Sequence, residues 1–442
     1  MKTTIIKIAL FGSLFTLLSC EGFLDEKPQK SLLVPESVQE VRALLDGYNY
    51  LSLTPLTSFI MSDEWKTTSQ DWQSFDPWQQ NAYLWKRNVF EPQERSSDYQ
   101  TLHGQLFIAN TALDILNRNP EAQASSEVNE LRGEALTIRA RACFDLALLF
   151  LPGPQSNRAD QITIPINLTP DINAPLEMLG IPELLEWIEE DLETAVEYLP
   201  TESEFKTRPD KLTAMALLSR VHLYQQNWDE ARDAAAYVIQ NGQRLLDYSE
   251  LNPAMLYPFE PFNQETVFFQ QMQTSVIPLR PSTNVVEELY ELYDENDLRK
   301  TLFFRISPTT SGPIFKGSYT GGFRLFSGIT LSEMYLTAAE SAIRTGQIQE
   351  GLEWLNQLGE NRYSNFQPWQ NLSQEEALEE ALKERRREMV YRNMRWMDMK
   401  RTKYLDPSFQ AEREIDGTVY TLNEEEQFVM EIPPYEVELG MN

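Results

Sequence analysis

The sequence contains few of the residues on which redox, metal and nucleophilic sites most often depend. Its 442 residues include two cysteines, Cys20 and Cys143, and two histidines, His103 and His222. Gly-x-Ser-x-Gly, His-Glu-x-x-His and glycine-rich phosphate-binding motifs are missing, which argues against serine hydrolases, zinc proteases and nucleotide-binding enzymes. Cys143 lies on a helical pattern without a second cysteine nearby, so we predict a buried small hydrophobe and not a nucleophile.

Positive charge is also scarce. The chain holds 38 Lys and Arg against 67 Asp and Glu, which gives a net charge of −29 at pH 7. A surface of this sign repels nucleic-acid backbones and anionic lipid headgroups, so we expect no nucleic-acid partner. After the first twenty residues no apolar run is long enough to span a bilayer, which needs about 20 residues.

The first twenty residues predict export and lipidation. Two lysines precede an apolar run at residues 8–18 that is too short to cross a membrane and is followed by Ser-Cys. This pattern is typical of a lipoprotein signal peptide (1–19), whose removal leaves Cys20 to carry the lipid. Two acyl chains suffice for stable anchoring, at about 0.8 kcal/mol per buried CH₂. Residues 20–36 would form a lipidated tether; ordinary secretion with a free Cys20 is the alternative.

Apolar residues at helical spacing dominate the remaining chain, and we expect residues 37–442 to form one all-α domain. Amphipathic patterns predict single helices or helical stretches over five ranges: 37–51, 99–116, 128–151, 181–199 and 373–401. Two further stretches, 211–242 and 330–359, each predict a pair of helices joined by a short polar turn.

The two helix pairs, 211–242 and 330–359, look like tetratricopeptide-type units. At an offset of 120 residues, Gln226 in the first turn aligns with Gly346 in the second. Gly242 is expected to end the first pair in a left-handed conformation. Such a pair cannot bury its apolar face alone, so at least about three repeats normally stack together. Two unrelated helical hairpins are the alternative reading of the same pattern.

Two stretches interrupt the helical pattern and form the candidate ligand side of the domain. Residues 59–90 hold four of the nine tryptophans among Asp, Gln, Ser and Pro, and residues 251–328 are rich in Pro, Gly, Thr and aromatics. The first predicts mainly loop, and the second predicts loops and short strands. Tryptophan offers a flat apolar face with a hydrogen-bonding edge, which suits a sugar ring or a peptide side chain. The candidate ligand-binding residues are Trp65, Trp72, Phe75, Trp78, Trp85 and Asp71. The alternative is that each tryptophan is a core anchor.

A basic cluster on the predicted helix 373–401 stands out in this acidic chain. It consists of Arg385, Arg386, Arg387, Arg392, Arg395 and Arg401. Anion binding is one interpretation. Helical spacing, however, sets most of these arginines beside glutamate or aspartate, so we predict structural ion pairs.

Short motifs are distributed along nearly the whole chain. They are Phe23-Leu24-Asp25-Glu26-Lys27-Pro28, Gly133-Glu134-Ala135 with Arg139-Ala140, Ile188-Glu189-Glu190-Asp191-Leu192, Tyr293 to Arg299, Ser332 to Leu336, and Glu384-Arg385-Arg386 with Glu388, Arg395-Trp396 and Asp398 to Arg401. Their order and completeness resemble the SusD/RagB family of nutrient-binding lipoproteins of the Bacteroidetes. The sequence departs from the family pattern at Thr330 and at Arg392-Asn393, both expected within the helical scaffold.

The resemblance implies an α-helical, tetratricopeptide-containing protein that is lipid-anchored on the surface of the outer membrane. A SusC-like TonB-dependent transporter would lie beneath it. The protein would capture an oligomeric nutrient, usually a glycan and in some members a peptide, and close it as a lid against the transporter. The family is not catalytic, and neither a cofactor nor a metal is implied. Its ligands are held mainly by exposed aromatics and amide or acidic side chains on variable loops, so no motif transfers individual site positions.

Three other functions are compatible with the sequence. A helical surface glycosidase needs only two carboxylates about 5 to 9.5 Å apart, and Asp63, Glu64 and Asp71 are the first candidates. A lid for peptides would keep the family and change the ligand, whereas a helical adaptor would bind only protein. The richness in tryptophan favours a glycan.

Overall fold

The computed structural model describes three parts of the chain: residues 37–118, 125–171 and 173–440. The predicted signal peptide (1–19), the lipidation site Cys20 and the tether (20–36) lie outside these residues. Helices dominate the regular structure that is described, and its strands are two to five residues long. The all-α, tetratricopeptide-like class with a short-strand elaboration is therefore confirmed.

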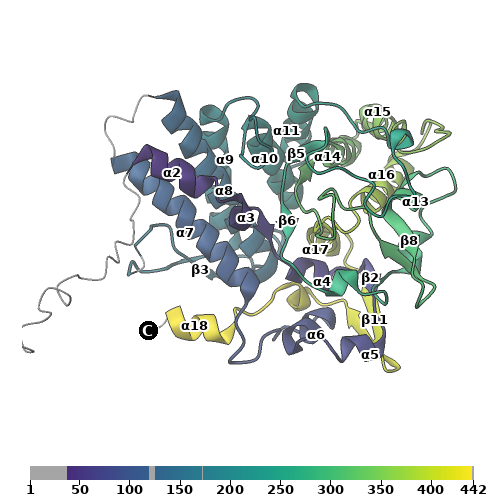
Figure 1. Ribbon diagram of the computed structural model, residues 1–442, viewed down its shortest axis with the longest axis horizontal. Coiled ribbons are helices and arrows are strands. Elements are labelled where there is room, and N and C mark those ends of the chain that lie inside the picture. The colour runs from purple at the N-terminus through teal and green to yellow at the C-terminus, as the bar shows by residue number, and fades with distance from the viewer. Residues whose placement is uncertain (1–36, 119–124, 172, 441–442) are drawn as a thin grey trace, which may run out of the picture.

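The long helices form a continuous stack along the molecule (Figure 1). In chain order they are α7 (Ser97–Arg118), α8 (Ser126–Phe150), α9 (Ile181–Tyr198), α10 (Lys211–Gln225), α11 (Trp228–Asn241), α14 (Leu331–Arg344), α15 (Ile348–Gly359) and α16 (Gln374–Glu388). From α7 to α15 each packs against the next, and α16 covers α14 and α15. Each pair thus buries its apolar face against the following pair, as stacked helical repeats do.

Both predicted helix pairs form, as α10–α11 and α14–α15, and their turns are alike. Gln226 and Gly346, which align at the offset of 120, both have positive φ angles, of 68° and 82°. The residue after each donates its backbone N–H to a carbonyl five residues earlier, from Asn227 to His222 and from Gln347 to Ala342. The left-handed residue of the first unit therefore lies in the turn. The prediction that Gly242 is left-handed is wrong, since its φ is −78°.

The predicted continuous helix over 373–401 is also wrong, because the chain turns between α16 and α17 (Arg395–Leu405). Tyr391 and Asn393 both have positive φ, of 58° and 66°, which α-helical geometry excludes. Arg392 and Asn393, expected within a helix, therefore lie in this turn. The Asn393 side-chain amide donates to the carbonyl of Pro55 over 3.0 Å.

Shorter elements make up the rest of the regular structure that is described. The remaining helices are α2 (Val38–Leu45), α3 (Tyr48–Leu51), α4 (Thr57–Met61), α5 (Ser69–Trp72), α6 (Pro77–Tyr83), α12 (Glu287–Tyr290), α13 (Arg299–Phe303) and α18 (Pro434–Gly440). The strands are β1 (Leu53–Thr54), β2 (Trp65–Lys66), β3 (Ile164–Ile166), β4 (Glu177–Leu179), β5 (Thr266–Phe268), β6 (Gln271–Met272), β7 (Asn284–Val285), β8 (Phe304–Ile306), β9 (Pro313–Phe315), β10 (Ile329–Thr330), β11 (Ala411–Ile415) and β12 (Thr418–Leu422).

Strand pairing joins the two stretches that interrupt the helical pattern. Strand β2 pairs antiparallel with β7, and β1 pairs parallel with β6. The first pairing places the tryptophan-rich residues 59–90 beside residues 284–285 of the second stretch, and the other joins residues 53–54 to residues 271–272 of that stretch. The β11–β12 hairpin lies next to α5 (Figure 1).

The basic cluster forms the ion pairs that were predicted. Arg385 pairs with Asp398, Arg401 with Glu340 and Asp398, Arg395 and Arg386 with Asp63, and Arg387 with Glu380 and Glu384. Arg392 is the exception, because its guanidinium carbon lies 3.7 Å from the Tyr319 ring centroid and it forms no ion pair with a described residue. Cys143 is fully buried, as predicted, and burial raises the pKa of its thiol.

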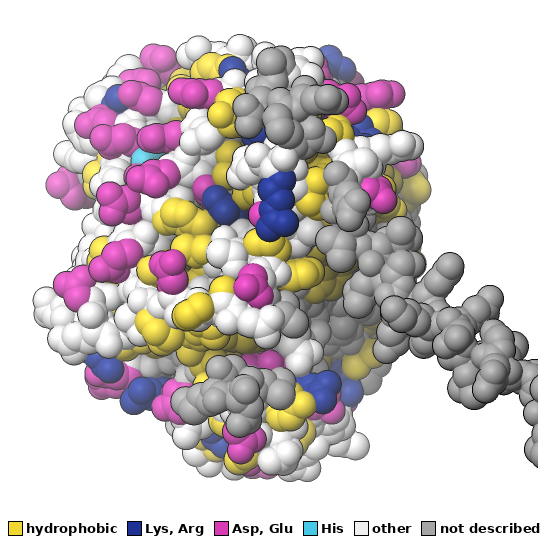
Figure 2. All heavy atoms as spheres, turned by 90° about the vertical axis from the view of Figure 1, so that its left-hand side faces the viewer, with side chains coloured by type: hydrophobic (Ala, Val, Ile, Leu, Met, Phe, Trp, Pro, Cys, Tyr) yellow, Lys and Arg dark blue, Asp and Glu magenta, His cyan; other side chains and the backbone are white. Residues whose placement is uncertain are grey.

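The surface has the acidic character that the composition predicts. Figure 2 shows acidic side chains scattered over the face at the left of Figure 1, around a band of hydrophobic side chains and with few basic ones. Within the described parts of the chain, none of the helices has both the length and the apolar character required to cross a membrane.

Candidate functional site

Three of the predicted ligand-binding residues lie in the core. Trp65 and Trp85 are each 1% exposed and Phe75 is 5% exposed. Both indole N–H groups donate to backbone carbonyls of α4, from Trp65 to Phe59 over 3.0 Å and from Trp85 to Met61 over 2.7 Å. These tryptophans hold α4 in place through their hydrogen bonds. Because their rings are buried and their N–H groups already have acceptors, they are not placed to contact a ligand.

A buried arginine organises this aromatic core. The guanidinium carbon of Arg413, on β11, lies 3.9 Å from the Tyr83 ring centroid, 4.4 Å from that of Trp85 and 5.5 Å from that of Trp65. Its N–H groups donate to the backbone carbonyls of Ile60, Ser62 and Tyr83. One cation therefore connects the end of α4 to the end of α6.

The other three predicted residues lie closer to the surface. Trp72 and Trp78 are half-buried, and Trp78 stacks on Phe90 with ring centroids 5.9 Å apart. Trp78 is the second residue of α6, which begins with a capping box at Asp76. Asp71 does not stand free, since it pairs with Arg280 over 3.0 Å. The six predicted ligand-binding residues therefore divide into three that are buried in the core and three that lie closer to the surface.

Trp78 lines a cavity of about 370 Å³, which lies within the roughly 300–1,000 Å³ typical of ligand pockets. The polar side chains around it are Thr57, Ser74, Asp76, Gln79, Ser96, Ser97, Asp98, Gln273, Thr274, Ser275 and Arg280. Two smaller hollows continue from it: one shares Arg280 with the cavity, and the other shares Gln273 to Ser275. We call these three hollows together the Trp78 groove.

Apolar residues that the composition argument missed lie along the Trp78 groove. Val276, Leu279, Phe323 and Leu256 are 45–62% exposed and line its hollows. The signal for Phe323 is local, because it follows Gly321-Gly322, and Gly321 has a positive φ of 65°. A glycine pair is typical of a loop, and an aromatic residue that follows it can be exposed to solvent on that loop.

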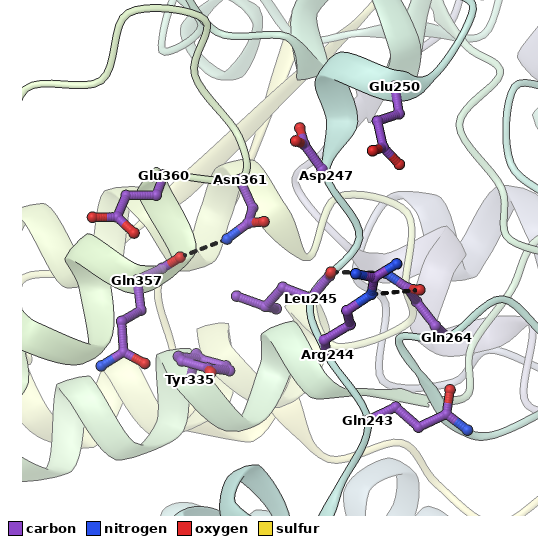
Figure 3. Close-up of a pocket in the computed structure, with 10 residues that line it drawn as sticks. All are labelled: Gln243, Arg244, Leu245, Asp247, Glu250, Gln264, Tyr335, Gln357, Glu360 and Asn361. Atoms are coloured by element: carbon purple, nitrogen blue, oxygen red, sulfur yellow. Dashed lines mark hydrogen bonds between the residues drawn. The ribbon is translucent and has the colours of Figure 1, made fainter.

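A separate cavity of about 430 Å³ lies between the helical repeats and residues 243–250 (Figure 3). Its lining is polar, with Tyr335 as its aromatic residue. Arg244 and Gln264 point toward one another, and their side chains are joined by a hydrogen bond of 3.2 Å (Figure 3). This cavity is larger than the one at Trp78, but it lacks an exposed tryptophan or phenylalanine face. The Trp78 groove is therefore the better site for a ligand with both apolar and polar faces.

The three candidate carboxylates of a glycosidase occupy structural positions. Asp63 pairs with Arg395 over 2.6 Å, and this ion pair lowers the pKa of Asp63 against the opposing effect of burial. Glu64 is 2% exposed and accepts the backbone N–H of Tyr391 over 3.1 Å. With Asp71 bound to Arg280, none of the three stands as a free acid or base in the groove.

Comparison with known families matches separate parts of the chain. The model described as SusD-like, starch-binding associating with outer membrane, covers residues 22–223, and that of the SusD family covers residues 326–438. The chain belongs to the SusD family. No curated protein sequence matches it.

Solved structures of SusD superfamily proteins share the fold of this SusD-family chain. One from Bacteroides thetaiotaomicron is 20% identical, with a TM-score of 0.74 over 92% of this chain and 98% of the other. One from Bacteroides fragilis is 19% identical, with a TM-score of 0.73 over 92% and 99%. A SusD-like carbohydrate binding protein from Bacteroides vulgatus is 17% identical, with a TM-score of 0.68 over 92% and 97%.

The motifs that carry the SusD resemblance are buried ion pairs of the scaffold. Arg139 of α8 pairs with Asp191 of α9 over 2.7 Å, and Glu333 of α14 accepts two hydrogen bonds of 2.8 Å from Arg220 of α10. Arg299 pairs with Asp297, Glu384 and Glu388 in a fully buried network. These residues hold the SusD fold and lie away from the Trp78 groove.

Proposed function

We propose that the protein is a cell-surface nutrient-binding lipoprotein that captures an oligosaccharide in the Trp78 groove. It would deliver the glycan, as a lid, to a SusC-like TonB-dependent transporter in the outer membrane. The observation that carries this proposal is a half-buried tryptophan at the wall of a polar cavity in a SusD-family fold. In this proposal residues 37–442 act as one domain and the lipid on Cys20 holds it at the membrane.

The chemistry of the groove supports a sugar ligand. The aromatic face of Trp78 can cover the C–H face of a sugar ring. Hydroxyl, amide and guanidinium groups around it can donate to and accept from sugar hydroxyls, which need both kinds of partner. The groove continues past Val276 to Phe323, so it can hold more than one ring. An extended groove with separated aromatic contacts suits an oligosaccharide better than a monosaccharide.

Calorimetric titration of the detergent-solubilised lipoprotein against a panel of oligosaccharides and peptides tests the proposal. We expect saturable binding to a glycan and about a tenfold loss of affinity in Trp78→Ala, because an aromatic contact contributes on the order of 1 kcal/mol. Trp369→Ala is the matched control, since Trp369 is also half-buried but does not line the groove. Binding of peptides alone, or equal binding by Trp78→Ala, would contradict glycan capture at this site.

Lipid anchoring and the transporter partner are tested separately. Metabolic labelling with a radioactive fatty acid should label the wild-type protein and not Cys20→Ala, and only the wild type should remain with the membrane fraction. Affinity purification of the wild-type lipoprotein should recover a TonB-dependent transporter. Recovery of the lipoprotein without a transporter would contradict the lid role while leaving glycan binding untouched.

A further inference from the structure

The part of the Trp78 groove beyond Val276 has a charge opposite to that of the chain. Its two smaller hollows are lined by four basic residues, Arg280, Arg305, Lys316 and Arg324. Among the described residues that line these hollows there is no Asp or Glu, although acidic residues outnumber basic ones by 67 to 38 in the sequence. In a protein of net charge −29, this surface concentrates positive potential in one place.

The β8–β9 hairpin brings two of these cations together. Arg305 is paired with Ile314 across the hairpin, and Lys316 follows Ile314 by two residues, so all three side chains share one face. Lys316 is 8% exposed, and its ammonium group donates to the backbone carbonyls of Pro253 and Met255. Lys316 is thereby fixed in the wall of the hollow, while the Arg305 side chain is exposed to solvent.

Three of the four cations lack an anionic partner in the described structure. Arg305 and Arg324 form no ion pair there, and Lys316 bonds only to carbonyl oxygens. Burial lowers the pKa of the Lys316 ammonium, and the neighbouring charge of Arg305 lowers it further. Arg280 is different, because it already pairs with Asp71. Like charges that lie close together without a counter-ion repel each other, and an anion bound between them relieves this repulsion.

The size and the apolar walls of the hollow restrict what can enter it. Its volume is about 70 Å³, against about 370 Å³ for the cavity at Trp78. A compact group such as a carboxylate or sulfate suits this smaller hollow. Leu279 and Phe323 stand exposed at the same hollow, where a ring that carries the acidic group can lie against them.

We propose that the Trp78 groove binds an acidic oligosaccharide, with the carboxylate or sulfate of one residue held between Arg305 and Lys316 and its ring against Phe323. The inference rests on the proposed function, because it names the class of glycan that the same groove takes. Arg324 lines the adjoining hollow and adds positive charge there.

The test begins with the detergent-solubilised lipoprotein on an array of uronic-acid, sulfated and neutral oligosaccharides. The strongest ligand is then titrated by calorimetry against wild type, Arg305→Gln, Arg324→Gln and Lys316→Gln. Arg305 and Arg324 are exposed, so their variants should fold even if Lys316→Gln does not. Arg118→Gln is the matched control, because this arginine on α7 is 77% exposed and lies outside the groove. The same ligand is also titrated after carboxyl reduction or desulfation, which removes the charge and keeps the linkages.

We expect an acidic oligosaccharide as the strongest ligand. Its affinity should fall about tenfold in Arg305→Gln and after removal of its charge, because each change removes a charge-assisted contact. Its affinity should also fall with added NaCl, whereas that of a neutral ligand should not. Loss on carboxyl reduction assigns the hollow to a uronic acid, and loss on desulfation assigns it to a sulfate ester.

Two outcomes would overturn the inference and leave glycan capture standing. One is a neutral oligosaccharide as the strongest ligand. The other is an acidic ligand whose affinity is the same in Arg305→Gln and in Arg118→Gln. Binding of acidic peptides and of no glycan would instead contradict the proposed function, and this inference with it.

Discussion

Replacing Arg413 by methionine tests whether one buried cation holds the helices that carry Trp78. Arg413 is 6% exposed and donates to the carbonyls of Ile60, Ser62 and Tyr83. It forms no ion pair with a described residue. Methionine fills a similar volume but has neither the charge nor the N–H donors.

The magnitude follows from the groups that the change leaves without a donor. Each buried polar group that loses its partner costs about 1–3 kcal/mol, and three carbonyls are affected here. The variant also avoids the cost of burying a guanidinium, which offsets part of this loss. We therefore expect the free energy of unfolding to fall by about 3 kcal/mol and Tm to fall by on the order of 5 °C.

Denaturant and thermal unfolding monitored by circular dichroism measure this effect. Arg158→Met is the control, because Arg158 forms a surface ion pair with Glu426, which should contribute less than about 1 kcal/mol. Affinity for the glycan should fall in Arg413→Met and not in the control, because α6 would lose its attachment to α4. A change below about 1 kcal/mol, or an unchanged affinity, would refute the role of Arg413 as the brace of this region.

Two further predictions concern pH and the repeat turns. Burial and the neighbouring Asp63 raise the pKa of Glu64 from 4.5 to about 8, so its contribution to stability is complete below pH 4.5 and is lost as the pH rises through 8. Glu64→Gln should match wild type near pH 5 and exceed its unfolding free energy by on the order of 3 kcal/mol above pH 8 in denaturant titrations; a difference that is independent of pH would contradict this. Gln226→Gly should stabilise the chain by about 1 kcal/mol and Gly346→Ala should destabilise it by about as much, because both positions are left-handed. Effects of equal sign in unfolding titrations would argue against conformational strain at these turns.

The helical scaffold is predictable because its signals are local. Apolar spacing located the repeat helices, and the offset of 120 aligned Gln226 with Gly346, which both take positive φ. The turn at residues 389–394 was missed because no glycine or proline marks it in the sequence. Its conformation depends on distant contacts, such as that of the Asn393 amide with Pro55, 338 positions earlier.

The binding site is less predictable, because burial is decided by segments far apart in the chain. Trp65, Trp78 and Trp85 are equivalent in composition arguments, yet Arg413 covers two of them from more than 300 residues away. Trp78 stays near the surface because it lies in the first turn of α6 and lines the cavity. The local sequence around each tryptophan does not contain this information.

The scaffold and the groove obey different physical constraints, which explains why motifs reveal the family and not the ligand. A buried charge such as Arg299 or Glu384 needs its partner, because an unpaired one costs about 3–5 kcal/mol. Such residues are therefore tied to each other across the fold. An exposed groove residue such as Arg305 or Phe323 can change with little effect on stability, so it is free to match a ligand. Lys316 is bonded to backbone carbonyls, but Arg305 and Arg324 form no ion pair with a described residue, so the fold does not require their charge. In our proposal, the acidic group of the ligand supplies the counter-charge for them.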